Sequence, residues 1–411
     1  MRFLVFLLLS ALAHWFLARW VISVWPAARR RSRYVYVGVA AVVGALAFAR
    51  FVAAFRGGHG VRLLMAAGLI ELSLVVLGLV PLFVVIVLTR GTFAMVDRFR
   101  PEPEAKSEPK SESESQSEST SEADDTFDDP VLSRRVAIER IAGSAVFVGG
   151  GVLLGWGYSR GRHAFEIEEV VVRVAGWPKA LEGYTIAQVS DVHLGAFVWE
   201  RELDEGFALV ERIKPDLVVA TGDLVDFEPE AIGPLARRLG ETRARDGAVA
   251  IVGNHDHYAG PDEVVEDLRA AKVRVLCNQG IRLREGDGGG FSLLGITDLV
   301  GRSRPKFHHH GPDLAKALAM VPSDLPRILL AHQPIFFDES AGRVALQLSG
   351  HTHGGQINPG FSPAGMVMKY VKGRYEANGS TLWVNRGFGV AGPPSRVGAP
   401  PEVTKIVIVG A

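Results

Sequence analysis

Long apolar segments separated by short basic ones occupy the first hundred residues of the chain. They run from Phe3 to Trp25, from Tyr34 to Ala49 and from Leu63 to Thr89. A helix needs about 20 apolar residues to cross a bilayer, and each segment is close to or beyond that length. The pattern therefore predicts a membrane region over residues 1–99 that contains three transmembrane helices.

The apolar pattern breaks at residues 100–132, where serine and glutamate dominate. Such a composition cannot bury enough apolar surface to offset the entropy that is lost when the chain becomes ordered. We interpret this stretch as a disordered acidic linker, whose negative charge favours solubility over binding.

Residues 133–160 form another apolar stretch, "SRRVAIERIAGSAVFVGGGVLLGWGYSR". It carries no charge between Ile141 and Gly157, so it can form a fourth transmembrane helix. Its paired arginines, Arg134 and Arg135, also resemble a twin-arginine export signal, although they lie inside the chain. A buried helix of a soluble domain is the alternative, but glycines are unfavourable inside helices.

After about residue 165, short runs rich in β-branched residues replace the long apolar segments. Five of them end in polar clusters: "GYTIAQVSD", "PDLVVATGD", "AVAIVGNHD", "RILLAHQP" and "VALQLSGHTH". Helix-like segments such as "WERELDEGFALVERIK" separate the first three. Strands that alternate with helices predict an α/β domain built from layers. In such domains ligands bind at the loops that leave the strand ends.

The polar clusters consist of residue types that bind metal ions. Each cluster alone is a weak signal, because a lone histidine is more often a structural residue than a ligand. Together, each at the end of a strand, they form a strong signal. They comprise Asp191 and His193, Asp223 and Asp226, Asn254, His255 and Asp256, His332, and His351 and His353.

These residue types suit a site with two cations. A carboxylate such as that of Asp223 can bridge two ions about 3.5–4 Å apart, which clamp a phosphoryl group and lower the pKa of a shared water. Mixed imidazole, carboxylate and amide ligands favour Mn, Fe or Zn over Ca or Mg. In an extended segment residues i and i+2 point the same way, so Asp191 with His193, and His351 with His353, can each supply two ligands.

Charge and cysteine content change this picture little. Lys+Arg and Asp+Glu number 45 each, so net charge gives no indication of nucleic-acid binding. Cys277 is the one cysteine, which excludes an intrachain disulfide. Its apolar neighbours favour a small buried side chain over a nucleophile. We expect no nucleic-acid partner and no obligate protein partner.

The five clusters resemble the signature of the calcineurin-like metallophosphoesterase superfamily, which reads D-x-H, G-D-x-x-D, G-N-H-[DE], a lone H and G-H-x-H. The resemblance covers about residues 165–411 and implies a four-layer αββα sandwich, here preceded by an all-α transmembrane region. The tail "NRGFGVAGPPSRVGAPPEVTKIVIV" is similar to that of a membrane-anchored bacterial branch. That branch includes transmembrane proteins with a metallophosphoesterase domain and UDP-2,3-diacylglucosamine hydrolase-like phosphodiesterases.

The resemblance also implies a metal centre with two divalent ions, bridged by Asp223. The ligands of one ion would be Asp191, His193 and His353, and those of the other Asn254, His332 and His351.

Three further residues receive roles from the resemblance. His255 would protonate the leaving oxygen, with Asp256 orienting its ring, and a purely structural role for His255 is the alternative. Asp226 is expected to support the ligands without binding metal. Ser/Thr protein phosphatases of the superfamily carry an arginine after this aspartate, whereas this chain has Phe227, which argues against a phosphoprotein substrate.

We therefore expect a membrane-anchored, metal-dependent phosphoesterase that hydrolyses a phosphodiester or pyrophosphate bond in a lipid-linked substrate. By resemblance, a UDP-2,3-diacylglucosamine-like precursor of lipid A biosynthesis is the first named candidate. The basic turn "AARRRSR" is predicted to be cytoplasmic, which places the α/β domain outside a bacterial inner or plasma membrane. Because nucleotide-linked precursors are cytoplasmic, an extracytoplasmic site would favour an envelope phospholipid or polymer phosphodiester. The alternative of another class is a non-catalytic membrane receptor or scaffold that retains the fold.

Overall fold

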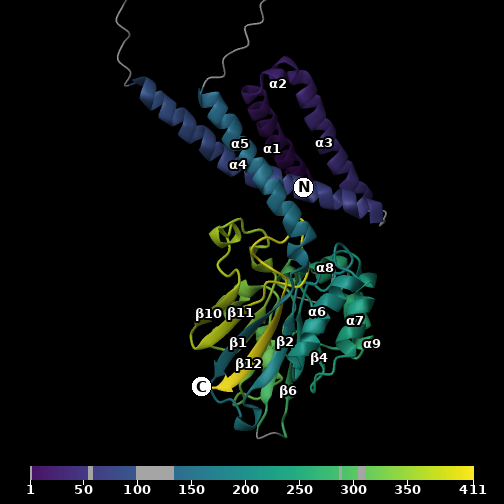
Figure 1. Ribbon diagram of the computed structural model, residues 1–411. Coiled ribbons are helices and arrows are strands. Elements are labelled where there is room, and N and C mark those ends of the chain that lie inside the picture. The colour runs from purple at the N-terminus through teal and green to yellow at the C-terminus, as the bar shows by residue number, and fades with distance from the viewer. Residues whose placement is uncertain (1, 54–58, 99–133, 287–288, 304–310) are drawn as a thin grey trace, which may run out of the picture. The chain divides into compact units, whose positions relative to one another are not determined.

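The computed structural model describes residues 2–53, 59–98, 134–286, 289–303 and 311–411 (Figure 1). The expected acidic linker at 100–132 lies outside the described residues. The chain divides into two compact units. One, the helical unit, combines Met1–Phe48 with Leu72–Gly151, and the other, the α/β unit, combines Ala49–Glu71 with Val152–Ala411.

Helices form at each place where the sequence predicts a membrane span. They are α1 (Arg2–Val24), α2 (Pro26–Arg30), α3 (Ser32–Ala53), α4 (His59–Arg98) and α5 (Arg134–Ser159). Within the described residues, Gly68–Val96 and Arg134–His163 are long and apolar enough to cross a membrane, and Ser32–Ala45 is a shorter apolar helix. The number of helices that cross a bilayer therefore stays a prediction.

Contacts within the helical unit join α1, α4 and α5. Trp20 and Val24 of α1 pack with Leu82 of α4, and Phe147 of α5 lies against this cluster. Arg90 of α4 also pairs with the buried Glu139 of α5 at 3.1 Å. A buried carboxylate needs such a partner, because an unpaired charge is costly away from water.

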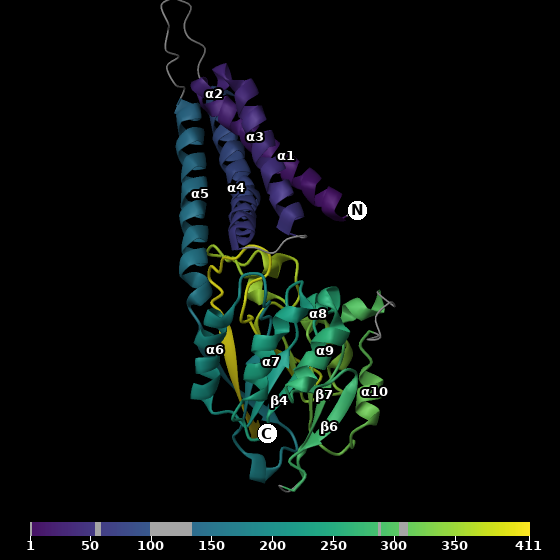
Figure 2. The ribbon, with the colours of Figure 1, turned by 90° about the vertical axis from the view of Figure 1, so that its right-hand side faces the viewer.

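Two six-stranded sheets form the centre of the α/β unit (Figure 2). The first sheet has the order β1 (Glu166–Val174), β12 (Glu402–Gly410), β2 (Tyr184–Val189), β3 (Leu217–Thr221), β4 (Ala248–Ile251) and β5 (Arg274–Val275). The second has the order β10 (Gly373–Ala377), β11 (Ser380–Val384), β9 (Leu346–Ser349), β8 (Arg327–Leu330), β7 (Phe291–Gly295) and β6 (Gln279–Leu283).

Helices and short 3₁₀ turns connect these strands. The helices are α6 (Glu200–Ile213), α7 (Gly233–Gly240), α8 (Asn254–Ala259), α9 (Pro261–Ala270), α10 (Leu314–Ala319) and α11 (Phe337–Ser340). The 3₁₀ turns are η1 (Gly161–His163), η2 (Lys179–Leu181), η3 (Pro229–Ile232), η4 (Leu299–Arg302), η5 (Pro334–Phe336), η6 (His353–Gly355) and η7 (Ala364–Met366).

Buried side chains divide the α/β unit into four layers. Ile186, Val219, Leu293 and Leu348 belong to a core that joins the two sheets. The other face of the first sheet packs against α6, α7 and α9, and that of the second against α10 and η5 (Figures 1 and 2). The prediction of an αββα sandwich is therefore confirmed.

The five predicted strands that precede polar clusters are present as β2, β3, β4, β8 and β9. Strands β2, β3 and β4 are parallel neighbours, and so are β8 and β9. Parallel strands place their carboxyl ends at the same edge of a sheet. The polar residues that follow the strands therefore gather at one end of the sandwich.

Helix α6 illustrates how the sequence pattern produces a packed layer. Leu203, Gly206, Val210 and Ile213 recur at helical spacing and are buried. A Cβ at Gly206 would collide with the ring of Phe388, so glycine permits a close approach to the C-terminal tail. Cys277 is half-buried, and this burial raises the pKa of its thiol to about 11, as expected for an inert thiol.

Candidate metal centre

Residues from five strand ends meet in three overlapping groups of atoms that could bind a metal. Two of the groups contain the ligands expected from the sequence, and the third joins His193, Asp226 and His255. In the first group, single ligand atoms of Asp191, His193 and His353 all lie within 4.8 Å of one another, and all three residues are buried. Nε2 of His353 is 3.1 Å from Nε2 of His193 and 3.6 Å from Oδ1 of Asp191. These distances leave room for one cation between three donors.

The second group contains Asp223, His332 and His351, again with ligand atoms within 4.8 Å. Nδ1 of His351 lies 3.2 Å from Nε2 of His332. Oδ1 of Asn254 is also 3.2 Å from this Nε2 atom, so the amide belongs to the same group. The structure therefore brings together the residues that the resemblance assigned to each ion.

The carboxylate of Asp223 lies between the two groups. Its Oδ2 atom is 3.6 Å from Nε2 of His193 and 3.2 Å from Nε2 of His332. Its Oδ1 atom accepts a hydrogen bond from the backbone N–H of His255 at 2.8 Å, which fixes the carboxylate plane. One oxygen thus faces both groups, as a bridging ligand requires.

The residues fit a pair of divalent cations by the chemistry of the donors and by the shape of the backbone. A Cβ at Gly350 would collide with the carboxylate of Asp191, and one at Gly253 would collide with that of Asp223. Both glycines therefore allow backbone to lie directly against a ligand. Imidazole, carboxylate and amide donors favour borderline metals such as Mn, Fe or Zn.

The backbone at the strand ends differs from the extended form expected from the sequence. Asp191, His193, Asp223, His351 and His353 have φ between 49° and 73°, in the left-handed region that residues other than glycine rarely adopt. This conformation turns His351 and His353 toward different groups, whereas an extended segment would point them the same way. Strained backbone of this kind is typical of functional sites.

Contacts behind the ligands select which imidazole nitrogen faces the centre. Nδ1 of His332 lies 2.9 Å from the carbonyl oxygen of Thr221, and Nδ1 of His193 lies 3.2 Å from Oδ1 of Asp226. Both rings donate from Nδ1, so Nε2 is left as the donor atom to metal. Asp226 therefore lies behind His193, and its role in supporting a ligand stays a prediction.

Charges within the cluster shift the pKa values of its members in different directions. Burial opposes ionisation of Asp223, but the positive charge and hydrogen bond of His332 hold the pKa of this carboxyl well below its usual range. The same contact raises the pKa of His332 against the effect of burial. Burial and neighbouring positive charges lower the pKa of His353, so its imidazole stays neutral. An ionised carboxylate and neutral imidazoles are the forms that bind metals.

His255 lies beside these two groups, with 20% of its side chain exposed. Its Nδ1 atom is 2.8 Å from Oδ1 of Asp226 and 3.1 Å from the carbonyl oxygen of the same residue. Burial lowers the pKa of His255, but the hydrogen bond to Asp226 and the charge of Asp223 outweigh it and raise the pKa to about 9. The rings of Phe227 and Tyr258 flank the imidazole at 5.6 and 5.5 Å between centroids. A protonated imidazole beside the candidate metal ligands is suited to general acid catalysis.

The partner of His255 differs from the one expected from the sequence. We expected Asp256 to orient the ring, but the contacts of His255 run to Asp226. Asp256 accepts hydrogen bonds from the backbone N–H groups of Leu224, Val225 and Gly253 at 2.8–3.0 Å. The expectation was wrong because the first turn of α8 carries adjacent side chains to different sides of the helix, so Asp256 faces the β3 loop.

Sequence reasoning missed Arg396. This residue is buried, and its Nη2 atom lies 3.1 Å from Nδ1 of His353. Its guanidinium also donates to the backbone carbonyls of Arg386, Gly389 and Ala399. The sequence feature that could have identified Arg396 is its place as the one charged residue in the run "VAGPPSRVGAPP", which is otherwise apolar or small.

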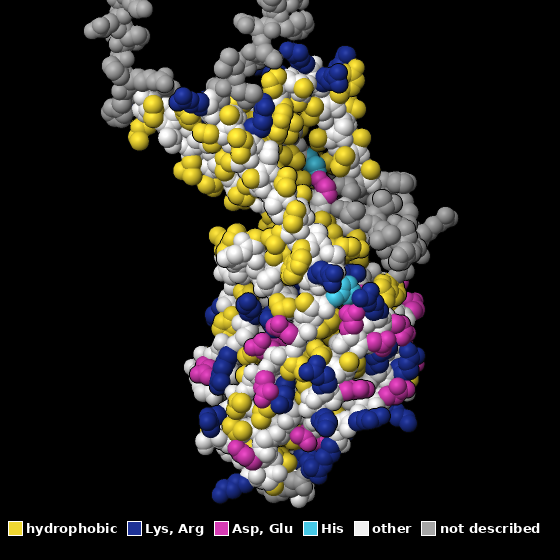
Figure 3. All heavy atoms as spheres, viewed as in Figure 1, with side chains coloured by type: hydrophobic (Ala, Val, Ile, Leu, Met, Phe, Trp, Pro, Cys, Tyr) yellow, Lys and Arg dark blue, Asp and Glu magenta, His cyan; other side chains and the backbone are white. Residues whose placement is uncertain are grey.

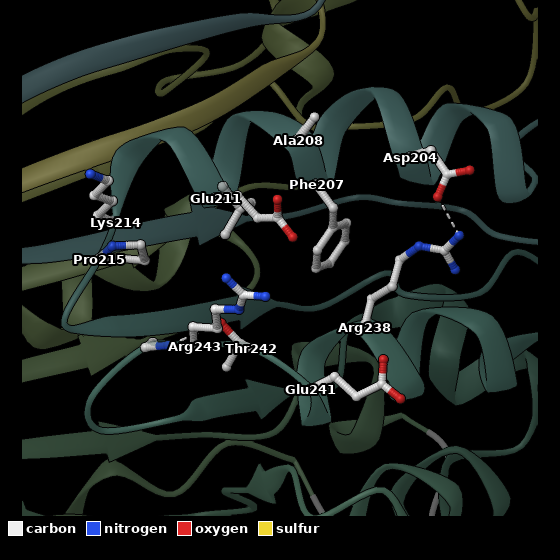
Figure 4. A pocket seen from close by; sticks show the side chains of 12 residues that line it. Asp204, Phe207, Ala208, Glu211, Lys214, Pro215, Arg238, Glu241, Thr242 and Arg243 are labelled. Atoms are coloured by element: carbon white, nitrogen blue, oxygen red, sulfur yellow. Dashed lines mark hydrogen bonds and ion pairs between the residues drawn. The ribbon is translucent and has the colours of Figure 1, made fainter.

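A separate cleft of about 720 Å³ lies between α6 and α7 (Figure 4). Phe207 lies in its floor, and Glu211, Arg238 and Arg243 border it. Arg238 is paired with Asp204 across its edge at 2.6 Å. Its lining includes none of the candidate metal ligands, so the cleft is separate from the metal centre.

Comparisons with known proteins agree with this geometry. Residues 184–355 match the family described as calcineurin-like phosphoesterase. The chain is 33% identical over 279 residues to "Uncharacterized metallophosphoesterase YkuE" of Bacillus subtilis, covering 64% of this chain and 92% of that protein. It is 32% identical over 250 residues to "Transmembrane protein with metallophosphoesterase domain" of Danio rerio, covering 59% of this chain and 57% of the relative.

Other matches are more partial. The chain is 34% identical over 250 residues to "Uncharacterized metallophosphoesterase Cj0846" of Campylobacter jejuni, covering 60% of this chain and 63% of that protein. The chain thus spans less than two thirds of this relative and of the Danio rerio protein. Among solved structures, the calcineurin-like phosphoesterase YfkN from Bacillus subtilis matches 53% of this chain and 89% of that chain with 15% identity and a TM-score of 0.35, a distant likeness.

The family of this chain is assigned from the agreement between its sequence matches and the geometry of its site. The match to YkuE extends over most of that protein, and the family match includes β2, β3, β4, β8 and β9 together with the residues that follow them. The chain belongs to the calcineurin-like metallophosphoesterases.

Proposed function

We propose that this protein is a membrane-anchored phosphoesterase that uses two divalent metal ions to hydrolyse a phosphodiester or pyrophosphate bond in a lipid-linked substrate. The observation that carries the proposal is the position of Asp223 Oδ2, within 3.6 Å of His193 and 3.2 Å of His332. A single carboxylate oxygen shared by two sets of donors is the arrangement of a two-metal hydrolase.

Asp191, His193 and His353 would hold one ion, Asn254, His332 and His351 the other, with Asp223 shared. When bound, the two cations supply Lewis-acid chemistry at the phosphoryl oxygens and activation of a water molecule. Mn, Fe and Zn are the proposed metals, because the donor set mixes imidazole with oxygen ligands.

The protein's own residues would complete the reaction at the leaving group. His255 would transfer a proton from its imidazole to the leaving oxygen, while Asp226 holds the ring through Nδ1. Phe227 and Tyr258 border His255 with apolar rings, which would exclude water from the departing group and suit an apolar substituent on it.

Two features support a lipid-linked substrate at a membrane. Within the part of the chain that the structure describes, two helices are long and apolar enough to cross a bilayer, and the second ends only a few residues before β1. The site is therefore tethered to the surface on which lipid substrates occur. A UDP-2,3-diacylglucosamine-like lipid A precursor is the first candidate to assay if the site is cytoplasmic, and an envelope phospholipid or polymer if it is extracytoplasmic.

The proposal is tested with the full chain in detergent and Mn²⁺, on an aryl phosphodiester. We expect Asp223→Asn to lower kcat/KM by more than about 100-fold, because an amide cannot bridge two cations. The control is Asp204→Asn, an exposed surface carboxylate of α6. Full activity in Asp223→Asn would contradict the two-metal mechanism. A topology reporter fused after residue 411 then decides between the cytoplasmic and extracytoplasmic substrates.

A further inference from the structure

We propose that the loop after the metal-binding histidines inserts into the membrane surface and presents the metal centre to lipid headgroups. The inserting part, here named the apolar tip, comprises Phe361, Met366, Val367 and Met368. This inference rests on the proposed membrane-anchored function and adds to it the surface by which the α/β unit contacts lipid.

The apolar tip is exposed to an unusual degree. Met366 is 79% exposed and Val367 is 85% exposed, and Phe361 and Met368 are exposed as well. Singly exposed apolar side chains are common, but several in one short loop mark an interaction surface. Met and Phe side chains are also well suited to an adaptable apolar contact.

Both ends of the loop are attached to the segment that carries His351 and His353. Thr352, between the two histidines, donates its hydroxyl to the carbonyl of Val371 at the far end of the loop. Asn358, at the near end, donates to the carbonyl of Gly354 at 2.9 Å. The loop is therefore a rigid extension of the metal-binding segment, and contact at its tip brings the substrate surface to the metal centre.

The same end of the α/β unit receives the last turns of α5. The carbonyl of Leu154 accepts from Ser395 at 3.0 Å, and that of Gly157 accepts from the backbone N–H of Arg396 at 3.2 Å. The adjacent Val397 exchanges backbone hydrogen bonds with Gln356 and Asn358, at the base of the loop. The apolar tip therefore lies at the end of the unit where a helix able to cross a membrane arrives.

Charge next to the apolar tip matches an anionic lipid surface. Lys369, which pairs with Asp338 at 2.7 Å, and Lys372 lie within four residues after the tip, and both are exposed. In interfacial membrane binding, apolar side chains insert into the membrane while neighbouring lysines contact the headgroups. Figure 3 shows hydrophobic side chains on the upper end of the α/β unit, whereas its lower surface mixes charges of both signs.

A depth measurement tests the proposal without requiring turnover. The full chain in a Cys277→Ala background carries one new cysteine, Val367→Cys, labelled with an environment-sensitive dye. It is reconstituted into phosphatidylethanolamine–phosphatidylglycerol vesicles that contain nitroxide groups on the acyl chains. The control is Glu376→Cys on β10, which lies toward the opposite ends of the strands. We expect about half or more of the emission to be quenched at position 367 and little at 376.

Equal quenching at the two positions would overturn the proposal. Emission changes at 367 that depend on the protein-to-lipid ratio would also overturn it, because they would indicate that the tip binds a second copy of the chain. Since neither result depends on hydrolysis, the outcome is independent of whether the proposed phosphoesterase activity is confirmed.

A kinetic measurement then connects the tip to the site. We expect Val367→Ser to lower the ratio of activity on a vesicle-borne phosphodiester to activity on a water-soluble one about tenfold, the cost of one missing apolar insertion. Val367→Leu should retain the ratio. A ratio unchanged in Val367→Ser would show that the tip does not serve substrate capture at the membrane.

Discussion

The guanidinium of Arg396 lies against the imidazole of His353, with Nη2 at 3.1 Å from Nδ1. A guanidinium can only donate, so the lone pair of Nδ1 faces Arg396 and accepts from it. Nε2 is the atom that faces His193 and Asp191. The contact with Arg396 therefore keeps the ring in place, with Nε2 directed toward the other ligand atoms of this group.

Replacement of Arg396 by lysine should weaken the metal centre. Lysine cannot reproduce the planar set of donors that satisfies the carbonyls of Arg386, Gly389 and Ala399. We expect a loss of about 1–3 kcal/mol in the free energy of unfolding and about 10–100-fold weaker metal binding. Metal titration that follows activity measures the second effect, and Arg343→Lys on an exposed loop is the control. A variant that is destabilised but binds metal normally would limit Arg396 to a structural role.

His255 should matter most where the leaving oxygen is a strong base. We expect His255→Ala to lower kcat about 10²–10⁴-fold for an alkyl leaving group and far less for p-nitrophenolate, which departs without a proton. The measurement is the dependence of kcat on the pKa of the leaving alcohol in both proteins. The same loss for all leaving groups would contradict the acid role.

Substitutions of the neighbouring carboxylates Asp226 and Asp256 should have different effects. Asp226→Asn removes the charge that holds His255 and His193, so it should reproduce part of the leaving-group dependence of His255→Ala. Asp256→Asn places an amide N–H₂ group where an oxygen now accepts backbone hydrogen bonds. We expect it to lower the free energy of unfolding by about 1–3 kcal/mol.

Denaturant unfolding and leaving-group kinetics on both variants decide the assignment. A leaving-group effect in Asp256→Asn and none in Asp226→Asn would restore Asp256 as the residue that orients His255.

Metal affinity should fall as the pH falls. The negative charge of Asp223 raises the pKa of His332, so this imidazole holds a proton over a wider pH range than a free histidine. A cation at Nε2 must displace that proton, and lower pH favours the protonated form. Calorimetric titration with Mn²⁺ in buffers of different ionisation enthalpy should detect proton release. Binding without proton release, and with equal affinity at pH 6 and pH 8, would contradict this prediction.

The five strands that precede the polar clusters were predictable from the sequence, because each is a short run of β-branched residues that ends in a polar cluster. The gathering of the candidate metal-binding residues at one edge was predictable for the same reason, since parallel strands place their ends together. His332 is the clearest example: alone it carries no signal, but its place after β8 made it a candidate.

Contacts between loops were not predictable in this way. Asp226 rather than Asp256 contacts His255 because of the direction of the side chains in the first turn of α8. The spacing of residues in the sequence does not predict this direction. Arg396 lies more than forty residues beyond His353 in the sequence, in a loop without regular structure. Its contact exists only because the C-terminal tail returns along β12 beside β2.

The sequence by itself determined the layered α/β domain, the apolar helices and the candidate metal-binding side chains, because these depend on local pattern and chemical type. The tertiary structure decided which nitrogen of each imidazole faces the centre, which carboxylate supports His255, and which apolar loop stays exposed. Those features depend on close packing between segments far apart in the chain and on backbone conformations that are stable only within the folded core.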